Sequence, residues 1–237
     1  MGRDFLPRAK SIVSEMTMAV ERLKDMSRYA RGSFTLACVP SMLAQALSPL
    51  IRRYAEAYLG NRIRIIDTNA FEVRDAVLHG QAELGVGIPT DHHPDLDETL
   101  LMEDPLMFFC REEHPLSKME SVTWSDVHEA ELIVVSSMTA TSVFMGYQLA
   151  ERGISLSGAY EVLHHATALS LVAAGVGTAI LPASTSQDGS RPGLCCIPLT
   201  GPVVKRRVAV LTRRNATLSP AARAFFDILK QSASVMV

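Results

Sequence analysis

Several side chains that could hold a small anion stand in turns between apolar segments. Ser41 and Asn69 each stand directly before a stretch with helical apolar spacing, where a helix is expected to begin. The free amides and the dipole at a helix N-terminus favour a carboxylate or a sulfate. Three hydroxyls follow the apolar run at 132–135, beside a third expected helix start: Ser136, Ser137 and Thr139. These residues suggest binding of a small acid.

The neighbouring histidines His164 and His165 allow more than one role. An imidazole has an ordinary pKa of about 6.5, so the pair could bind an anion, respond to pH or stay neutral inside the protein. We expect them at the rim of a pocket. Ser41 also has two interpretations, a ligand contact or only a helix cap. His92 and His93 lack the spacing of a helical metal site, so a solvated loop is expected there, with no metal and no cofactor.

The segment Gly175-Val-Gly177 superficially resembles half of a dinucleotide-binding loop. A phosphate loop runs from a strand into a helix, so that the amides of the helix N-terminus face the anion. Here an expected helix at 167–172 runs into an apolar strand at 178–181, and the third glycine is missing. We therefore predict a helix-to-strand turn, with Gly175 in the left-handed conformation of a helix end.

Residues 32–104 predict a βαβαβ unit. Strands are expected at 34–39, 62–67 and 82–88, and helices between them end at Gly60 and Gly80. This alternation is typical of a parallel sheet. Ligands of such sheets bind beyond the carboxyl ends of the strands, so the turns that follow these strands are expected to contribute a site.

A second βαβαβ pattern follows in residues 105–207. Strands are expected at 106–110, 132–135, 160–163 and 178–181, with a short helix capped by Thr123 and another through 143–149. A strand at 206–211 and a helix capped by Ser219 complete the chain, and we assign 208–237 to the first unit. The fold class expected is α/β, with two Rossmann-like subdomains and a ligand cleft between them.

The first 31 residues have a period of their own. Apolar side chains recur in steps of four and three, as on the seam of a coiled coil: Phe5, Ala9, Ile12, Met16, Ala19, Leu23, Met26 and Ala30. A long linker helix that pairs with a partner helix is expected, the alternative being a helix packed on its own domain. Seven basic and four acidic residues give this segment a charge of +3, which ordinary solvated surface explains as well as DNA contact.

Composition restricts the class of protein. About half of the 237 residues are apolar, yet the apolar runs are far shorter than the roughly 18 residues of a membrane span. No secretory signal is visible, so the cytoplasm is expected, and the four cysteines lack paired zinc-site spacing and are expected to be reduced. We find no activated nucleophile and no Gly-x-Ser-x-Gly turn, and we expect no enzyme activity.

Five segments together resemble the effector-binding domain of LysR-type transcriptional regulators, over nearly the whole chain. They are Ser33–Ser41, Ala76–Ile88, His114–Leu116, Leu171–Pro182 and Leu218–Arg223. The resemblance implies two periplasmic-binding-protein type II-like subdomains that close around a small effector, often an organic acid. Full-length members add an N-terminal winged helix-turn-helix, so the chain is expected to be a truncated regulator that begins at the linker helix.

The resemblance also implies which residues line the cleft. They are Pro40, Ser41, Met42, Asn69, Ala70, Gly87, Ile88, Ser136, Ser137, Met138, Thr139, His164, His165 and Thr167. None of these turns contains Arg or Lys, so an effector with an apolar portion is expected. The implied partners are the effector, further copies of the chain in a homodimer or homotetramer, and promoter DNA through the missing domain. The alternative is a stand-alone solute-binding protein of the same fold, which would require an export signal.

Overall fold

The chain forms two compact units. A computed structural model describes residues 12–13, 16–18, 32–89, 92–127, 131–136, 146–147, 149–151, 157–185 and 192–233. Unit 1 comprises Met1–Met102 and Val208–Val237, and unit 2 comprises Glu103–Arg207. The chain therefore passes from unit 1 to unit 2 once and returns once.

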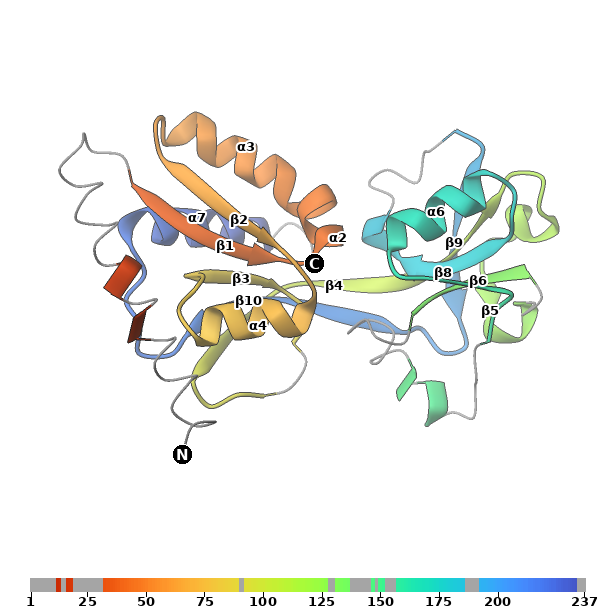
Figure 1. The fold of residues 1–237 in the computed structure, drawn as a ribbon. Coiled ribbons are helices and arrows are strands. Elements are labelled where there is room, and N and C mark those ends of the chain that lie inside the picture. The colour runs from red at the N-terminus through yellow and green to blue at the C-terminus, as the bar shows by residue number, and fades with distance from the viewer. Residues whose placement is uncertain are drawn as a thin grey trace. The chain divides into compact units, whose positions relative to one another are not determined.

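Unit 1 is built on a sheet in the order β2-β1-β3-β10 (Figure 1). Strands β1 (Ser33–Cys38), β2 (Arg62–Asp67) and β3 (Leu84–Gly87) are parallel, and β10 (Lys205–Arg213) is antiparallel to β3. Cys38 at the end of β1 is level with Asp67 on one side and Val86 on the other. The parallel βαβαβ unit predicted from the sequence is thus confirmed, with its carboxyl ends at one edge.

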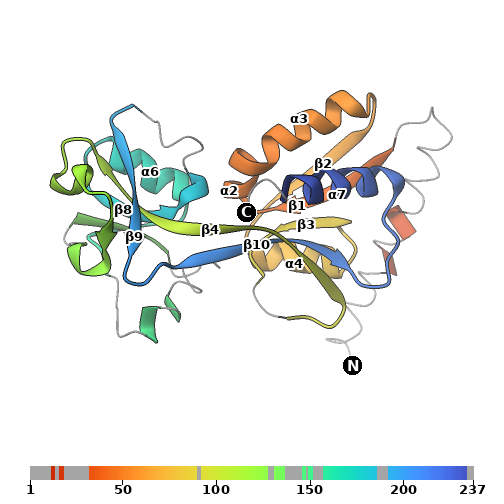
Figure 2. The ribbon, with the colours of Figure 1, turned by 180° about the vertical axis from the view of Figure 1, so that it is seen from behind.

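Helices cover both faces of this sheet. Helix α4 (Ala70–Leu78) packs against β1 and β3, whereas α3 (Ser48–Ala57) and α7 (Pro220–Ala233) lie together on the opposite face, as the two views show (Figure 1, Figure 2). Short helical turns precede α3: α2 (Pro40–Met42) and a π-helical turn, Leu43–Leu47. Phe34, Tyr54 and Phe225 bring β1, α3 and α7 together, with ring centroids 5.4–5.8 Å apart.

Unit 2 has a sheet in the order β9-β4-β8-β6-β7. Strands β6 (Leu132–Val135), β7 (Tyr160–Val162) and β8 (Thr178–Pro182) are parallel, in the arrangement that the second βαβαβ pattern predicts. The long strand β4 (Leu96–Arg111) is antiparallel to β8 and to β9 (Leu194–Thr200), and the short β5 (Val122–Thr123) pairs with β9.

Two apolar clusters sandwich the sheet of unit 2. Helix α6 (His165–Ala173) packs Ala168, Leu169 and Val172 against one face. Phe108 and Trp124 belong to the cluster on the other face, beside 3-10 helices at Pro115–Lys118 and Trp124–Asp126. A third 3-10 turn, Ala183–Thr185, follows β8 and contacts α6. Because α6 is anchored by its apolar face, its first turn has a fixed position in unit 2.

The glycine turn after α6 has the predicted form. Gly175 has a φ of +78°, the left-handed conformation that favours glycine at a helix end. A Cβ on Gly177 would lie 2.2 Å from the carbonyl oxygen of Glu131. This glycine allows β8 to start directly beside β6, which explains the segment by packing and not by a phosphate.

Of the first 31 residues, the structure describes only 12–13 and 16–18. Residues 12–13 and 16–18 are helical, and Ile12 and Met16 of the predicted seam are more than 60% exposed. The remainder of the predicted linker helix lies outside the described residues. Among the helices that the structure describes, none is long and apolar enough to cross a membrane.

Candidate functional site

The turns after the parallel strands of unit 1 lie beside one another. The amide of Val39, after β1, donates to the carbonyl of Val86 in β3 at 3.2 Å. The amide of Thr68, after β2, donates to the carbonyl of Cys38 in β1 at 3.0 Å. The parallel sheet therefore brings together three turns that are distant in sequence and that begin at Pro40, Thr68 and Ile88.

Asn69 is the N-cap of α4, as predicted. Its Oδ1 accepts a hydrogen bond from the amide of Glu72 at 3.0 Å. The hydroxyl of Thr68 donates to the carboxylate of Glu72, and Asp67 ends the preceding strand with an exposed carboxylate. Two acidic groups thus flank the start of α4, where they oppose a further anion and favour hydrogen-bond donors.

Ser41 does not cap a helix, so this prediction was wrong. The helix begins two residues earlier than this prediction requires, at Pro40, with Val39 as the N-cap and no side-chain cap. The fixed φ of proline and its missing N–H suit the first position of a helix, which moves Ser41 into the first turn. Ser41 is partly exposed there, and its role as a ligand contact stays a prediction.

Four of the residues expected to line the cleft are buried in the structure. They are Met42, Ala70, Gly87 and Ile88. The side chain of Met42 is 0% exposed and contributes to the core of unit 1. Side chains so placed shape the turns from behind, and we leave these four out of the set that we propose to touch a ligand.

In unit 2, the expected residues gather at the carboxyl ends of β6 and β7. The amide of Ser136, just after β6, donates to the carbonyl of Val162 in β7 at 2.7 Å. His164 then serves as the N-cap of α6 through its backbone, since its carbonyl accepts from the amides of Thr167 and Ala168. Ser137, Met138 and Thr139 were expected at this place and lie outside the described residues.

The first turn of α6 is accessible to solvent. His164, Ala166 and Thr167 are exposed and His165 is partly exposed. Burial lowers the pKa of His165 to about 4, with a further contribution from the positive charge of Arg206. His165 is therefore neutral at pH 7, and one of its ring nitrogens can donate a hydrogen bond.

Arg206 was not anticipated near this turn. It lies on β10 between the exposed Lys205 and Arg207, so its buried side chain points inward. A charged residue at an inward position of an alternating strand was the available signal. It bonds to Asp104 of β4, and both side chains are only 1% exposed.

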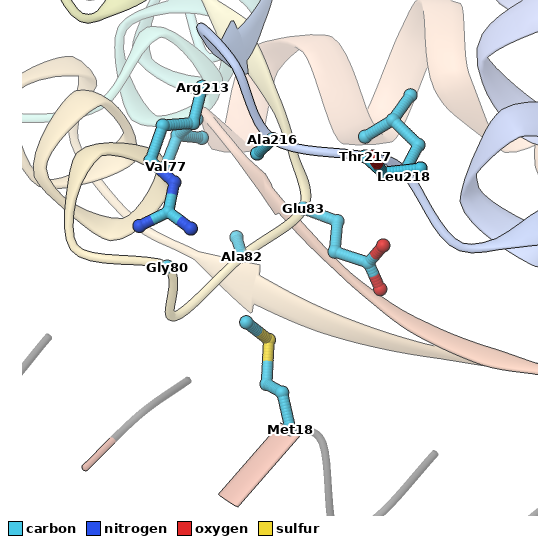
Figure 3. Close-up of a pocket in the computed structure, with 9 residues that line it drawn as sticks. All are labelled: Met18, Val77, Gly80, Ala82, Glu83, Arg213, Ala216, Thr217 and Leu218. Carbon is cyan, nitrogen blue, oxygen red and sulfur yellow. The ribbon is translucent and has the colours of Figure 1, made fainter. Parts of the chain in front are cut away.

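A cavity in unit 1 lies elsewhere. Its volume is about 280 Å³, and Figure 3 shows Glu83 and Arg213 among its lining residues, with Met18 at one side. Ala82 and Glu83 precede β3, so the cavity lies at the amino end of that strand. Glu83 accepts hydrogen bonds from the amide and hydroxyl of Ser219 at the start of α7. We assign this cavity no part in the site at the carboxyl ends.

The described residues offer little for metal binding or nucleophilic chemistry. No group of three or more His, Cys, Asp or Glu side chains among them could hold a metal ion. All four cysteines are free, and burial raises the pKa of Cys38 and Cys110 to about 12 and that of Cys196 to about 11. Thiols with such pKa values are poor nucleophiles at neutral pH.

Comparison with known proteins gives a family. Residues 27–234 match the LysR substrate binding domain. The chain is 31% identical over 228 residues to the uncharacterized HTH-type transcriptional regulator YbhD of Escherichia coli K12, covering 96% of this chain and 72% of YbhD. That relative is named as a transcriptional regulator and not as an enzyme.

Solved structures share the fold. The BenM effector binding domain with its effector benzoate superposes with a TM-score of 0.74 at 24% identity, covering 86% of this chain and 93% of that one. The effector binding domain of QuiR in complex with shikimate superposes with a TM-score of 0.75 at 18% identity, covering 87% of this chain and 99% of that one. The α/β sheets and helices described above are those of the periplasmic-binding-protein type II-like fold, and the chain belongs to the LysR substrate-binding domain family.

Proposed function

We propose that this chain is the effector-sensing part of a ligand-responsive transcriptional regulator, and that its effector is a small organic acid. Family membership and the likeness to YbhD support the regulator. Benzoate and shikimate, the ligands of the BenM and QuiR domains, each carry a carboxylate. We assign promoter contact to a winged helix-turn-helix that is joined to this part in the full-length regulator.

The observation that carries the proposed acid is the exposed first turn of α6. The amide of Thr167 already donates to the carbonyl of His164, so the amides of His165 and Ala166 are those that face away from the helix, and the helix dipole is positive at this end. Three groups act electrostatically on His165: Arg206, Asp104 and His164. Asp104 is the acidic group among them, and it is already paired with Arg206. An effector carboxylate at this turn would meet hydrogen-bond donors and no unpaired acid among these groups.

The turns of unit 1 favour neutral hydrogen-bond donors. Asp67 and Glu72 disfavour a second carboxylate near Asn69, whereas effector hydroxyl groups could donate to these oxygens. The proposed contacts are Pro40, Ser41 and Asn69 of unit 1 and Ser136, His164, His165 and Thr167 of unit 2, with Ser137 and Thr139 following Ser136.

A thermal-shift screen of small organic acids tests this function. Each acid is paired with its primary amide, which has a similar shape and no charge. A ligand at 100 times its dissociation constant should stabilise the protein by about 2.7 kcal/mol. We expect at least one acid to bind and its amide to bind much more weakly, because the amide cannot place a negative charge at α6.

The site is tested with two hydroxyl variants of the same helix. Thr167→Val removes an exposed hydroxyl from the first turn, whereas Ser170→Ala removes one a turn later, where Ser170 Oγ bonds to the carbonyl of Ala166. Only Thr167→Val should weaken the acid. Equal affinity of both variants and the parent chain would argue against α6 as the contact.

A further inference from the structure

Unit 2 contains a buried ion pair that the proposed effector contacts do not use. Arg206 is the largest fully buried side chain among the described residues, and Asp104 is equally buried. Arg206 Nε donates to Asp104 Oδ2 at 2.9 Å, and a second guanidinium nitrogen lies 2.8 Å from the same oxygen. Asp104 belongs to β4 and Arg206 to β10, the two strands through which the chain enters and leaves unit 2.

Ser184 extends this pair toward α6. Its amide donates to Asp104 Oδ1 at 3.0 Å and its hydroxyl donates to Oδ2 at 2.7 Å, while Arg206 donates to the same hydroxyl at 3.1 Å. Ser184 lies in the 3-10 turn Ala183–Thr185, which contacts α6. Hydrogen bonds with fixed directions thus join two connecting strands to the segment that supports α6.

Stability alone gives little reason for such a pair. Moving two charges out of water costs several kcal/mol for each ion, and apolar residues of similar volume are often at least as stabilising. What the charged pair adds is direction, because a guanidinium and a carboxylate satisfy each other in few orientations. The pair therefore fixes the relative position of three segments that are far apart in sequence.

We propose that Asp104 and Arg206 are positioning residues for effector binding: with Ser184, they hold the first turn of α6 at the place where the effector carboxylate is bound. This inference rests on the proposed function for the role of α6. Neither residue touches the effector, since both are buried below the turn. Burial is the larger cause of the lowered pKa of His165, the first residue of α6, and the positive charge of Arg206 lowers that pKa further.

The chain offers a matched control. Glu103 directly precedes Asp104 on β4, and Lys205 directly precedes Arg206 on β10. The side chains of Glu103 and Lys205 form an ion pair at 3.2 Å. Both are 51% exposed, so this pair contributes little to structure. We compare Asp104→Leu/Arg206→Met with Glu103→Gln/Lys205→Met in the complete chain. Arg206→Lys serves as a third variant, since it keeps the charge and loses the planar fork.

The first measurement needs no effector. NMR titration of the imidazole of His165 should give a higher pKa in Asp104→Leu/Arg206→Met than in the parent chain, because Arg206 has a larger influence than Asp104. The amide resonances of Ala166 and Thr167 should shift as well. The control pair should leave these signals unchanged. Unchanged signals in Asp104→Leu/Arg206→Met would overturn the proposal, and they would do so whether or not any acid binds.

The second measurement uses benzoate and shikimate as probes, together with any acid found by the screen. Loss of the buried pair should weaken a bound acid by roughly tenfold, the lower range for loss of supporting hydrogen bonds at a binding site. Arg206→Lys should lie between, and the control pair should match the parent chain. Equal affinity in all variants would contradict the positioning role. If no acid binds the parent chain, the proposed function fails, and the NMR result still decides the positioning of α6.

If Asp104→Leu/Arg206→Met does not fold, Arg206→Lys and Asp104→Asn carry the test. Each of them keeps the approximate volume and some hydrogen bonds, and each weakens the directional part of the network. Shifted α6 amides in both, with the control unchanged, support the proposal. Unshifted amides in both count against it.

Discussion

The side chain of Asn69 satisfies a backbone amide at the start of α4 and also determines the polar groups of that turn. Its Oδ1 accepts from the amide of Glu72, so a polar group that the helix leaves free is satisfied by the cap. The same turn gathers the hydroxyl of Thr68 and the carboxylate of Glu72. The cap therefore sets which oxygens this turn presents to a ligand.

Asn69→Ala should lower the free energy of unfolding by about 1 kcal/mol, the usual cost of losing an N-cap acceptor. Urea denaturation followed by circular dichroism measures the change. Asn69→Ser keeps an oxygen at this position and should retain most of the stability. If alanine and serine behave alike, the hydrogen bond to Glu72 contributes nothing to the stability of the helix.

At the residue scale, the sequence predicts what depends on local signals. Asn69 could be identified as a cap because it stands directly before the stretch with helical apolar spacing. Ser41 could not, since Pro40 takes the first helical position and the start lies two residues earlier than predicted. Arg206 contacts Asp104 and Ser184, which are distant from it in sequence, through the fold of unit 2. No local sequence pattern could predict these contacts.

The element that most closely controls the proposed site is α6 with the strand that follows it. Its apolar face packs on the sheet through Ala168, Leu169 and Val172. Gly175 ends the helix in a left-handed conformation, and Gly177 allows β8 to approach the backbone of Glu131. Both glycines follow the C-terminal end of α6, at the opposite end of the helix from the exposed first turn, and they fix how the helix continues into β8.

Gly177→Ala should destabilise unit 2 by about 1–3 kcal/mol, because the new Cβ would lie 2.2 Å from a carbonyl oxygen and the strands would have to separate. Thermal or urea unfolding gives the magnitude. Gly146→Ala is the control, since its Cβ would meet nothing within 4 Å. A Gly177→Ala protein as stable as this control would contradict the close packing described here.

Elements were predictable where their period was clear. The strands at 62–67 and 132–135 have the expected bounds, because their apolar runs end at turns. Strand β9 was missed, since Pro198 interrupts the run and burial does not alternate along it. Pro198 lies opposite Met107 in the antiparallel pair with β4, and such a pairing is invisible to a local pattern.

At the scale of the whole molecule, the N-terminal helix points to self-association. Ile12 and Met16 belong to the predicted seam and are 64% and 69% exposed. A helix with an exposed apolar seam buries it against a second helix of the same kind. We propose that the protein is a homodimer or homotetramer held in part by this helix.

Ile12→Glu/Met16→Glu should therefore shift the protein toward a smaller species in analytical ultracentrifugation, because two carboxylates on the seam would face the partner helix. Val13→Glu is the matched control: Val13 lies on the same helix, is 64% exposed and stands off the seam. If the parent chain is already monomeric at tens of micromolar, or if all variants sediment alike, the pairing of this helix is excluded.

The central claim is that this LysR-type domain senses a small organic acid through the first turn of α6. The most direct test is isothermal titration calorimetry with the best acid from the screen and its primary amide, on the parent chain, Thr167→Val and Ser170→Ala. We predict saturable binding of the acid, much weaker binding of the amide, and lost affinity in Thr167→Val alone. Equal binding of acid and amide, or an affinity that Thr167→Val leaves unchanged, would contradict the account.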